Sequence, residues 1–310
     1  MNCANCRIVK KMKSKIKIQN LTKYYGKQRG IENLDLEIYS GEIFGFLGPN
    51  GAGKTTTIRC MMNVLLPNMG EIWINGGKIT RRNPKIREKI GYIAEAGVLP
   101  ETYTTNDFLN YVESMRSIPS PRRDELIKRF SLPVKKKIGE LSKGNKQKVS
   151  IVAAFMHDPD VLILDEPTSG LDPLLQQETY DLILDAKSRG KTIFFSSHNL
   201  AEVQRICDRV GIVRDGYLIS VLDIESLNKE VSRILEVTLR NPNKQELQKF
   251  GENLLEIEEN RARILVPQSD SIEKYLEILI PMKPEEIVFP PASLEDYFLQ
   301  FYRQKEEGAI

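Results

Sequence analysis

Short apolar runs bounded by glycine or polar residues fill the first part of the chain and predict strands. From residue 16 to about 47 these runs are "KIKIQNLTKYYG", "GIENLDLEIYS" and "EIFGFLG". The next run, "TTTIRCMMNVLLP", has helical length and is predicted to end at Pro67. "GEIWINGG" then alternates apolar and polar residues between glycines, which predicts a further strand.

Helical patterning dominates residues 106–150, and buried strands follow it. The predicted strands are "DVLILDE", "KTIFFSS" and "RVGIVRDGYLISVLD", with a helix-like stretch between each pair. Apolar strands that alternate with helices are typical of a parallel sheet covered on both faces. The chain up to about residue 225 therefore predicts an α/β fold.

The composition changes near residue 225. Beyond it, "RILEVTLR", "NLLEIEENRARILVP" and "EEIVFP" predict strands, and "NKQELQKFG" and "SIEKYLEIL" predict helices between them. The closing segment "SLEDYFLQFYRQ" predicts an amphipathic helix with Ser293 as its N-cap. We expect a disordered leader over residues 1–15, a first domain over 16–225 and a small α+β domain over 226–310.

Length and composition fit a globular protein of two domains. The chain has 310 residues, of which 41% are hydrophobic and 28% charged, and its net charge is only +3. Bulk charge therefore argues neither for nor against nucleic acid as a partner, and only a local patch could decide it. No apolar run reaches the roughly 18 residues of a membrane span, and the basic start lacks the apolar core of a secretory signal. These features predict a cytoplasmic protein.

The chain has four cysteines, Cys3, Cys6, Cys60 and Cys207. Cys3 and Cys6 form a C-x-x-C pair, but a structural zinc site normally needs a second pair of ligands nearby. The two histidines, His157 and His198, lie far along the chain. A metal site at the N-terminus and an unstructured leader with two reduced thiols are both consistent with this spacing, and we favour the leader.

"GPNGAGKT", residues 48–55, matches the phosphate-loop pattern G-x-x-x-x-G-K-[ST] and lies between an apolar strand and a helix. Gly51 and Gly53 let backbone amides point at phosphate oxygens, and the helix start adds partial positive charge. Lys54 can reach the β- and γ-phosphates, and the Thr55 hydroxyl can ligate magnesium. Without a ligand Lys54 is expected to face solvent, so that Lys54→Ala should leave the fold intact. The predicted phosphate-binding set is Gly48, Pro49, Asn50, Gly51, Ala52, Gly53, Lys54, Thr55 and Thr56.

Two adjacent carboxylates end the apolar run "VLILDEP". Acids at the end of a buried strand are costly unless they bind a cation. Asp165 is placed to hold magnesium, as the second strand acid does in phosphate-loop ATPases. Glu166 then faces the γ-phosphate and can polarise the attacking water.

These motifs occur in one order: "YYG", the phosphate loop, "LSKG", "VLILDEPTSGLD" and "SSH". In this order, over residues 16 to about 220, the chain resembles the ATP-binding cassette of ABC transporters. The resemblance implies a phosphate-loop ATPase core with a mixed sheet and a helical subdomain at about residues 100–150. It also implies that two cassettes enclose two ATP molecules with Mg²⁺.

The resemblance assigns further roles position by position. Tyr25 would stack on adenine, and Asp165 would serve magnesium. Glu166 would be the catalytic base, and Lys54 would act on the phosphates. Asp172 in "SGLD" would communicate across the dimer. His198, after the apolar strand "TIFF", would contact the γ-phosphate and position the water.

"LSKG" departs from the family signature Leu-Ser-Gly-Gly-Gln. Ser142 and Gly144 are kept and would touch the γ-phosphate bound by the partner cassette. Lys143 adds positive charge beside a triphosphate, which is electrostatically tolerable. The motif is interpreted as degenerate but functional, against the alternative of a polar helix start. Such variants resemble those of drug-efflux and sodium-efflux exporters.

A second departure is Glu95, where the family usually has glutamine. A glutamate offers an oxygen to magnesium but adds negative charge near the γ-phosphate, so its role as a direct ligand is left open. Many efflux-type cassettes resemble this chain at that position.

Lysine and arginine are frequent over residues 122–148. A nucleic-acid patch is one interpretation, but no aromatic residues are interleaved there, and we favour a solvated face. No nucleic-acid partner is expected.

The resemblance thus implies an ATPase subunit that powers a separate membrane-embedded exporter, with this chain bound through that permease at the inner face of the cell membrane. A second cassette, identical or different, is required because the signature acts on the opposite chain. The efflux type also carries a C-terminal extension with a "SLEDVF"-like helix, which "SLEDYFLQFY" resembles. The alternatives are an ABC ATPase that acts on nucleic acid or ribosomes, and an importer ATPase.

Overall fold

The computed structural model describes residues 13–95, 99–116, 118–225, 233–240, 244–267 and 270–290. The chain divides into two compact units, Met1–Val221 and Leu222–Ile310, whereas the sequence placed the boundary between residues 225 and 226. The predicted pair Cys3 and Cys6 and the predicted closing helix at Ser293 lie outside the described residues.

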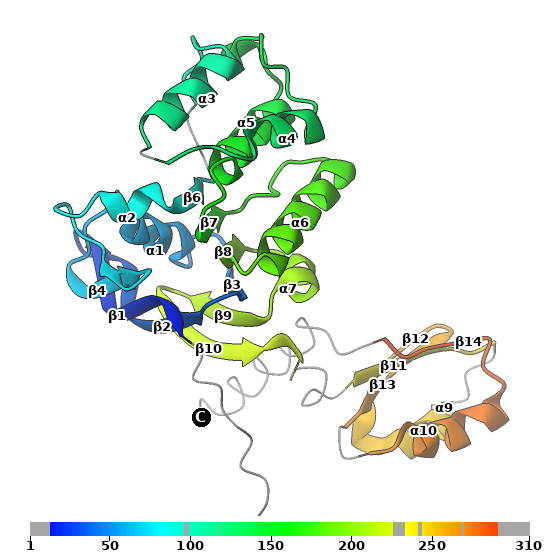
Figure 1. Cartoon of the computed structure of the whole chain (residues 1–310). Helices are drawn as coiled ribbons and strands as arrows, with labels where there is room; N and C mark the ends of the chain where they lie inside the picture. The colour runs from blue at the N-terminus through cyan, green and yellow to red at the C-terminus, as the bar shows by residue number, and fades with distance from the viewer. Residues whose placement is uncertain are drawn as a thin grey trace, which may run out of the picture. The chain divides into compact units, whose positions relative to one another are not determined.

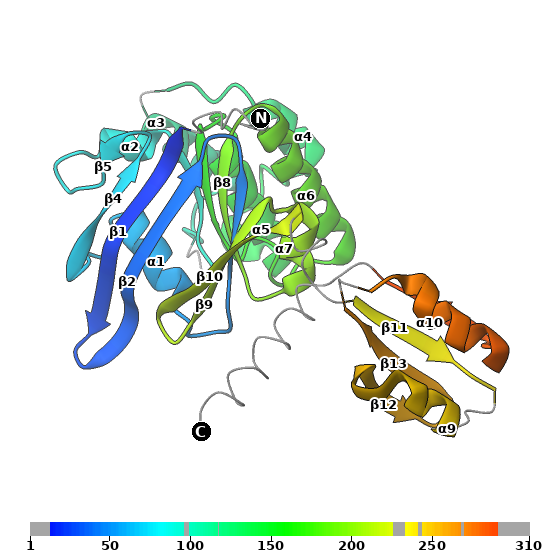
Figure 2. The ribbon, with the colours of Figure 1, turned by 90° about the horizontal axis from the view of Figure 1, so that it is seen from below.

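An antiparallel sheet with the order β2-β1-β4-β5 forms one layer of the first unit (Figure 2). Its strands are β1 (Ser14–Tyr25), β2 (Gln28–Tyr39), β4 (Met69–Ile74) and β5 (Gly77–Lys78). β1 therefore begins two residues before the predicted start of the first domain. The pairing of Ile16 with Ile38 and of Ile18 with Leu36 places buried apolar side chains on one face of the sheet.

A second sheet, of six strands, has the order β10-β9-β3-β8-β7-β6. Its strands are β3 (Ile43–Leu47), β6 (Ile90–Ile93), β7 (Val161–Asp165), β8 (Thr192–Ser197), β9 (Arg209–Arg214) and β10 (Tyr217–Asp223). β3 pairs in parallel with β8 and β9, and β7 pairs in parallel with β6 and β8. Every residue of β3, β7 and β8 is buried. The carboxyl ends of these strands meet at one edge, which is where ligands bind in such sheets.

Residues 209–223, predicted as one strand, form the two strands β9 and β10. Asp215 and Gly216 between them have φ values of 50° and 81°. Two consecutive left-handed residues make a tight hairpin turn, for which Asp-Gly is a favoured pair.

Helix α1 (Lys54–Met61) contributes Ile58 and Met61 to a core that contains apolar side chains of both sheets. The helix was predicted to continue to Pro67, and this prediction is wrong. Asn63 has φ 54°, a left-handed conformation that does not continue an α-helix. A short helix, α2 (Lys85–Glu88), precedes β6.

The helical subdomain contains α3 (Thr105–Ser114), α4 (Arg123–Arg129), the 3₁₀ turn η1 (Ile138–Glu140) and α5 (Lys143–Phe155), drawn together in green in Figure 1. Its core includes Leu109, Leu126 and Val149. Four basic residues of this region pair with acids: Arg123 with Glu113, Arg122 with Glu125 and Asp185, Arg129 with Glu178, and Lys146 with Glu101. This pairing is typical of a solvated face.

Two helices lie on the side of the six-stranded sheet that faces away from α1 (Figure 1). α6 (Pro173–Ser188) packs against β8, and α7 (Leu200–Ile206) packs against β3 and β8. None of the helices in the described part of the chain is both long and apolar enough to cross a lipid bilayer. The predicted α/β fold class, with a mixed sheet core and a helical subdomain, is confirmed.

Buried His157 predicts a specific sensitivity to acid. Its Nε2 contacts Nη1 of Arg116, and burial, with the Arg116 charge, lowers the pKa of His157 to about 3. In the unfolded chain this histidine has an ordinary pKa of about 6.5, so the unfolded state takes up a proton more readily than the folded state. Above pH ~6.5 the histidine is neutral in both states and folding is not penalised. As the pH falls from there toward 3, the unfolded state gains a proton that the folded state does not, and the protein loses stability.

Between pH 7.5 and pH 4.5 the free energy of unfolding should fall less in His157→Gln than in the wild type. We expect the two decreases to differ by about 2–3 kcal/mol. Urea unfolding followed by fluorescence of Trp73, the only tryptophan in the chain, measures this in the first unit. Equal losses in the two proteins would show that His157 is not the acid-sensitive group.

The second unit is a four-stranded antiparallel sheet with the order β12-β13-β11-β14. Its strands are β11 (Arg233–Thr238), β12 (Leu254–Glu258), β13 (Arg261–Val266) and β14 (Glu286–Val288). The helical segments are α9 (Lys244–Leu247), η2 (Gln248–Asn253), α10 (Ile272–Leu279) and η3 (Ile280–Met282). Leu235, Val237 and Ile264 form a core with Phe250 and Tyr275, whose rings stack at 6.0 Å.

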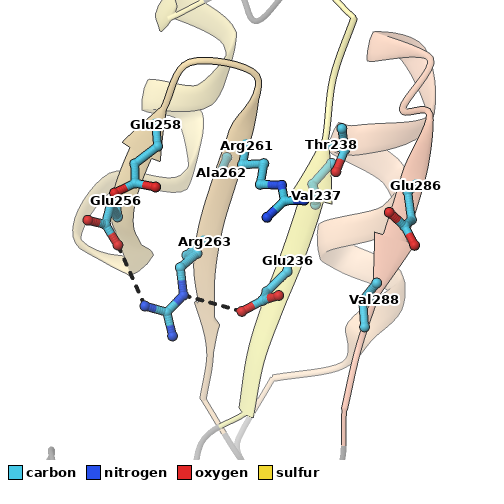
Figure 3. A pocket seen from close by; sticks show the side chains of 10 residues that line it. All are labelled: Glu236, Val237, Thr238, Glu256, Glu258, Arg261, Ala262, Arg263, Glu286 and Val288. Carbon is cyan, nitrogen blue, oxygen red and sulfur yellow. Dashed lines mark ion pairs between the residues drawn. The ribbon is translucent and has the colours of Figure 1, made fainter.

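The outer face of this sheet is charged. The strand register aligns Glu256, Arg263 and Glu236 in one row, and Arg263 lies 3.5 Å from Glu256 and 3.4 Å from Glu236 (Figure 3). A polar outer face over an apolar inner face is typical of an antiparallel sheet with one side in solvent.

Candidate nucleotide site

The phosphate loop joins the buried strand β3 to helix α1. Gly51 and Gly53 have φ values of 81° and 106°, a region that favours glycine. A Cβ atom at Gly53 would lie 2.5 Å from the carbonyl oxygen of Gly30. A Cβ atom at Gly48 would lie 2.2 Å from the carbonyl oxygen of Val213. The loop therefore has the tight backbone that a phosphate cradle requires.

A pocket of about 390 Å³ lies over this loop. Tyr25, with 45% of its surface exposed, forms part of its wall, and its hydroxyl lies 3.3 Å from Oγ1 of Thr56. Gly48 and Ala52 are buried. The predicted residues that line the pocket are Tyr25, Pro49, Asn50, Gly51, Gly53, Lys54, Thr55, Thr56 and Glu95.

Lys54 is buried, and the expectation that it faces solvent is wrong. Only 5% of its surface is exposed. Its ammonium group donates to the carbonyl oxygens of Gly48 at 2.6 Å and Pro49 at 3.3 Å. It also lies 3.2 Å from Oε1 of Glu166. The cation of the loop and the predicted catalytic base are therefore a buried ion pair.

Glu166 is held from several sides. Its other carboxylate oxygen, Oε2, lies 2.9 Å from Nδ1 of His198, and its backbone N–H donates to Oγ of Ser196 at 3.1 Å. Its φ of 48° is unusual for a residue other than glycine and costs on the order of 1 kcal/mol. Strained backbone of this kind clusters at active sites. The structure thus brings Lys54, Glu166 and His198 together.

Asp165 lies beside Glu166 and is fully buried. Oδ1 accepts a hydrogen bond from Ser196 at 2.7 Å, and Oδ2 has no hydrogen-bond partner among the described residues. Burial raises the pKa of Asp165, while the hydrogen bond from Ser196 acts in the opposite direction.

The donor atoms around Asp165 suit magnesium. Thr55 donates to Oε2 of Glu95 at 3.1 Å, so a hydroxyl and two carboxylates are grouped here. No group of three His, Cys, Asp or Glu side chains forms a metal site in the described part of the chain. This small set fits Mg²⁺, which binds through one or two carboxylates together with substrate phosphates.

Ser142 and Asp172 both start helices. Ser142 is the N-cap of α5 and accepts from the backbone N–H of Asn145 at 3.3 Å. Asp172 is the N-cap of α6 and accepts from the backbone N–H of Leu175 at 3.0 Å. The pocket over the phosphate loop is not lined by Ser142, Gly144 or Asp172 of the same chain.

The sequence did not single out several residues at this site. Ser196 links Asp165 and Glu166, and Gln147 of α5 donates to the carbonyl oxygen of Pro167 at 2.8 Å. Arg29 and Gly30 also line the pocket over the phosphate loop. Ser196 could have been found from its place at the end of an apolar strand, before His198. Arg29 carries no comparable signal.

Comparisons with known proteins agree with this geometry. The profile of the family described as ABC transporter matches residues 31–169. An uncharacterised ABC transporter ATP-binding protein of Methanocaldococcus jannaschii is 37% identical over 72% of this chain and 83% of its own. The bacitracin transport ATP-binding protein of Bacillus licheniformis is 38% identical over 75% of this chain and 78% of its own. The linearmycin resistance ATP-binding protein of Bacillus subtilis is 33% identical over 66% of this chain and 68% of its own.

Solved structures show the same fold. An ATP-binding subunit of an ABC transporter superposes with a TM-score of 0.65 at 26% identity, covering 85% of this chain and 98% of the other. A dimeric cassette bound to ADP and Pi in a post-hydrolysis state has a TM-score of 0.62 at 26% identity, covering 67% of this chain and 98% of the other.

Proposed function

The chain belongs to the family of ABC transporter ATP-binding proteins, and on that premise we propose that it powers a separate membrane-embedded exporter. It is an ATPase. The observation that carries the proposal is the grouping of Lys54, Glu166 and His198 beside a phosphate loop. Three side chains from distant parts of the chain meet where the γ-phosphate would lie.

Each of these side chains has a proposed task. Glu166 takes the proton of the attacking water as general base. His198, hydrogen-bonded to Glu166, orients that water and contacts the γ-phosphate. Lys54 already donates to two loop carbonyls, so its ammonium is fixed next to the phosphate cradle. Tyr25 stacks on adenine at the exposed wall of the pocket.

We propose Asp165 and Thr55 as the protein ligands of Mg²⁺, with Glu95 beside them. The unpartnered Oδ2 of Asp165 supports this, because a buried carboxylate oxygen is costly unless it meets a donor or a cation. When bound, Mg²⁺ would neutralise charge on the β- and γ-phosphates. The chain's part is to hold these oxygens in place.

A complete site is proposed to need two cassettes. Ser142, Gly144 and Asp172 lie outside the nucleotide pocket of their own chain, which fits a role toward a partner. The dimeric structural relative supports this arrangement. A partner permease, and hence a position at the inner face of the membrane, is part of the same proposal.

Export is favoured over the alternatives. The relatives named for bacitracin transport and linearmycin resistance support it, as do the altered signature at Lys143 and Glu95 in place of glutamine. The ion pairs of the basic residues between 122 and 148 give no support to a nucleic-acid partner. An importer ATPase is the second candidate.

Transport by inverted membrane vesicles tests the direction. The vesicles would contain this chain co-expressed with the proposed multi-span permease, with labelled bacitracin and ATP outside. We expect ATP-dependent accumulation inside, and a loss of about 100-fold or more when Glu166→Gln replaces the wild type. Uptake by right-side-out vesicles loaded with ATP would instead identify an importer.

A further inference from the structure

Arg29, a cation in β2, lines the nucleotide pocket together with Tyr25 and the phosphate loop. Its side chain is 37% exposed. The side chains of Tyr25 and Thr56 pack closely against the backbone of the neighbouring Gly30. A Cβ atom at Gly30 would lie 2.9 Å from Tyr25 and 3.0 Å from Thr56. Arg29 thus stands next to the junction between the proposed adenine wall and the start of helix α1.

The guanidinium group of Arg29 is fixed in place. Nε donates to the carbonyl oxygen of Asp215 at 2.7 Å, and Nη1 lies 2.6 Å from the Tyr217 hydroxyl and 3.2 Å from Oε2 of Glu32. The group also lies 4.3 Å from the centroid of the Tyr217 ring. The Tyr217 hydroxyl in turn donates to Glu32 at 2.7 Å. Such a planar fork loses little freedom when it binds a further oxygen.

The turn that holds Arg29 is tied to the phosphate loop. The backbone N–H of Gly216 donates to the carbonyl oxygen of Ala52 at 3.1 Å. The backbone N–H of Glu32 donates to the carbonyl oxygen of Gly216 at 2.8 Å. Arg29 is therefore linked through backbone hydrogen bonds to the loop that would hold the phosphates.

One nitrogen of Arg29 remains available. Nη2 makes no hydrogen bond or ion pair with any residue that the structure describes. Its two N–H donors are the ones left for a ligand in the pocket. We propose that Arg29 binds the α-phosphate of the nucleotide, which lies between the base and the β-phosphate. This inference rests on the ATP site proposed above and adds a substrate contact to it.

Binding of ATP and ADP by the full chain tests the proposal. We expect Arg29→Met to raise the Kd for both nucleotides by an equal factor of about 10 to 100, as for loss of one charge-assisted hydrogen bond. The kcat at saturating ATP should change by less than about twofold, since this contact is the same in ground state and transition state. Arg29→Lys, which keeps the charge, should recover part of the affinity.

Tyr217→Phe is a second, milder test variant, because it removes the hydroxyl that holds Arg29 and leaves the ring. It should raise both Kd values in the same direction but less. If Arg29→Met is unstable by thermal unfolding, Arg29→Lys and Tyr217→Phe decide the question. Unchanged Kd values in these variants would overturn the inference, and so would a loss confined to ATP, which would place the contact at the γ-phosphate.

Lys54→Ala separates failure of this inference from failure of the site. If Lys54→Ala loses nucleotide binding while the Arg29 variants bind normally, only the role of Arg29 is wrong. If Lys54→Ala also binds ATP with wild-type affinity, the nucleotide site itself is wrong.

Discussion

Glu166→Gln is expected to lower ATP turnover by about 100-fold to 10,000-fold, which is the usual effect of removing a well-placed general base. The amide keeps the shape of the carboxylate and can still contact His198 and Lys54, which lie 2.9 Å and 3.2 Å from it. ATP binding should therefore persist. Single-turnover hydrolysis assays at saturating ATP measure the rate without a contribution from affinity.

Trapped ATP should hold two Glu166→Gln chains together. The proposed contacts come from Ser142 and Gly144 of the opposite chain, so an ATP-dependent dimer should survive size-exclusion chromatography. Adding Gly144→Asp should return it to monomer, because a carboxylate would face the γ-phosphate. A Cβ atom at Gly144 meets nothing within 4 Å, so the fold itself has room for the change.

Gly144→Asn is the matched control, since it has nearly the same size and no charge, and it should weaken the dimer less. Lys143→Gly should keep the dimer, because Lys143 is interpreted as tolerated and not required. A stable ATP-bound dimer that persists with Gly144→Asp would mean that "LSKG" is only a polar helix start.

Lys54→Ala is expected to abolish ATP binding and also to destabilise the first unit by about 3 kcal/mol. The second effect follows from burial. Lys54 is 5% exposed and lies 3.2 Å from Glu166, which is equally buried. Without the ammonium, the buried carboxylate of Glu166 would keep only His198 as a side-chain partner among the described residues. Urea unfolding followed by Trp73 fluorescence and nucleotide titration measure the two effects separately.

A double variant tests the cause. Lys54→Ala with Glu166→Gln removes both charges, so it should recover most of the lost stability and none of the ATP binding. If the double variant is no more stable than Lys54→Ala, the ion pair is not what stabilises Lys54 in the fold. If Lys54→Ala hydrolyses ATP at a rate close to that of the wild type, the phosphate-loop assignment is wrong.

The sequence by itself determined the features that depend on neighbouring residues. The spacing of Gly51 and Gly53 predicted the turn that joins β3 to α1, and both have the left-handed backbone that glycine tolerates. The apolar run before Asp165 and Glu166 predicted a buried strand that ends in acids. Ser142 begins a helix, as predicted from the run that follows it. Family membership rested on the order of such local motifs and is confirmed by the comparisons.

Only the tertiary structure decided which side chains meet and how deeply they are buried. Lys54 was expected in solvent, but its ammonium is buried against the carbonyl oxygens of the loop and the carboxylate of Glu166. Ser196 reaches Asp165 because β8 is the neighbour of β7. Arg29 lines the pocket over the phosphate loop, and its guanidinium group is held there by Asp215 and Tyr217, which lie far along the chain.

The physical reason is one of range. Glycine conformation, helix capping and hydrophobic periodicity act within a few residues, so a sequence pattern shows them directly. Burial and the pairing of charges depend on strand order and packing, which bring together Lys54 at the start of α1 and Glu166 directly after β7.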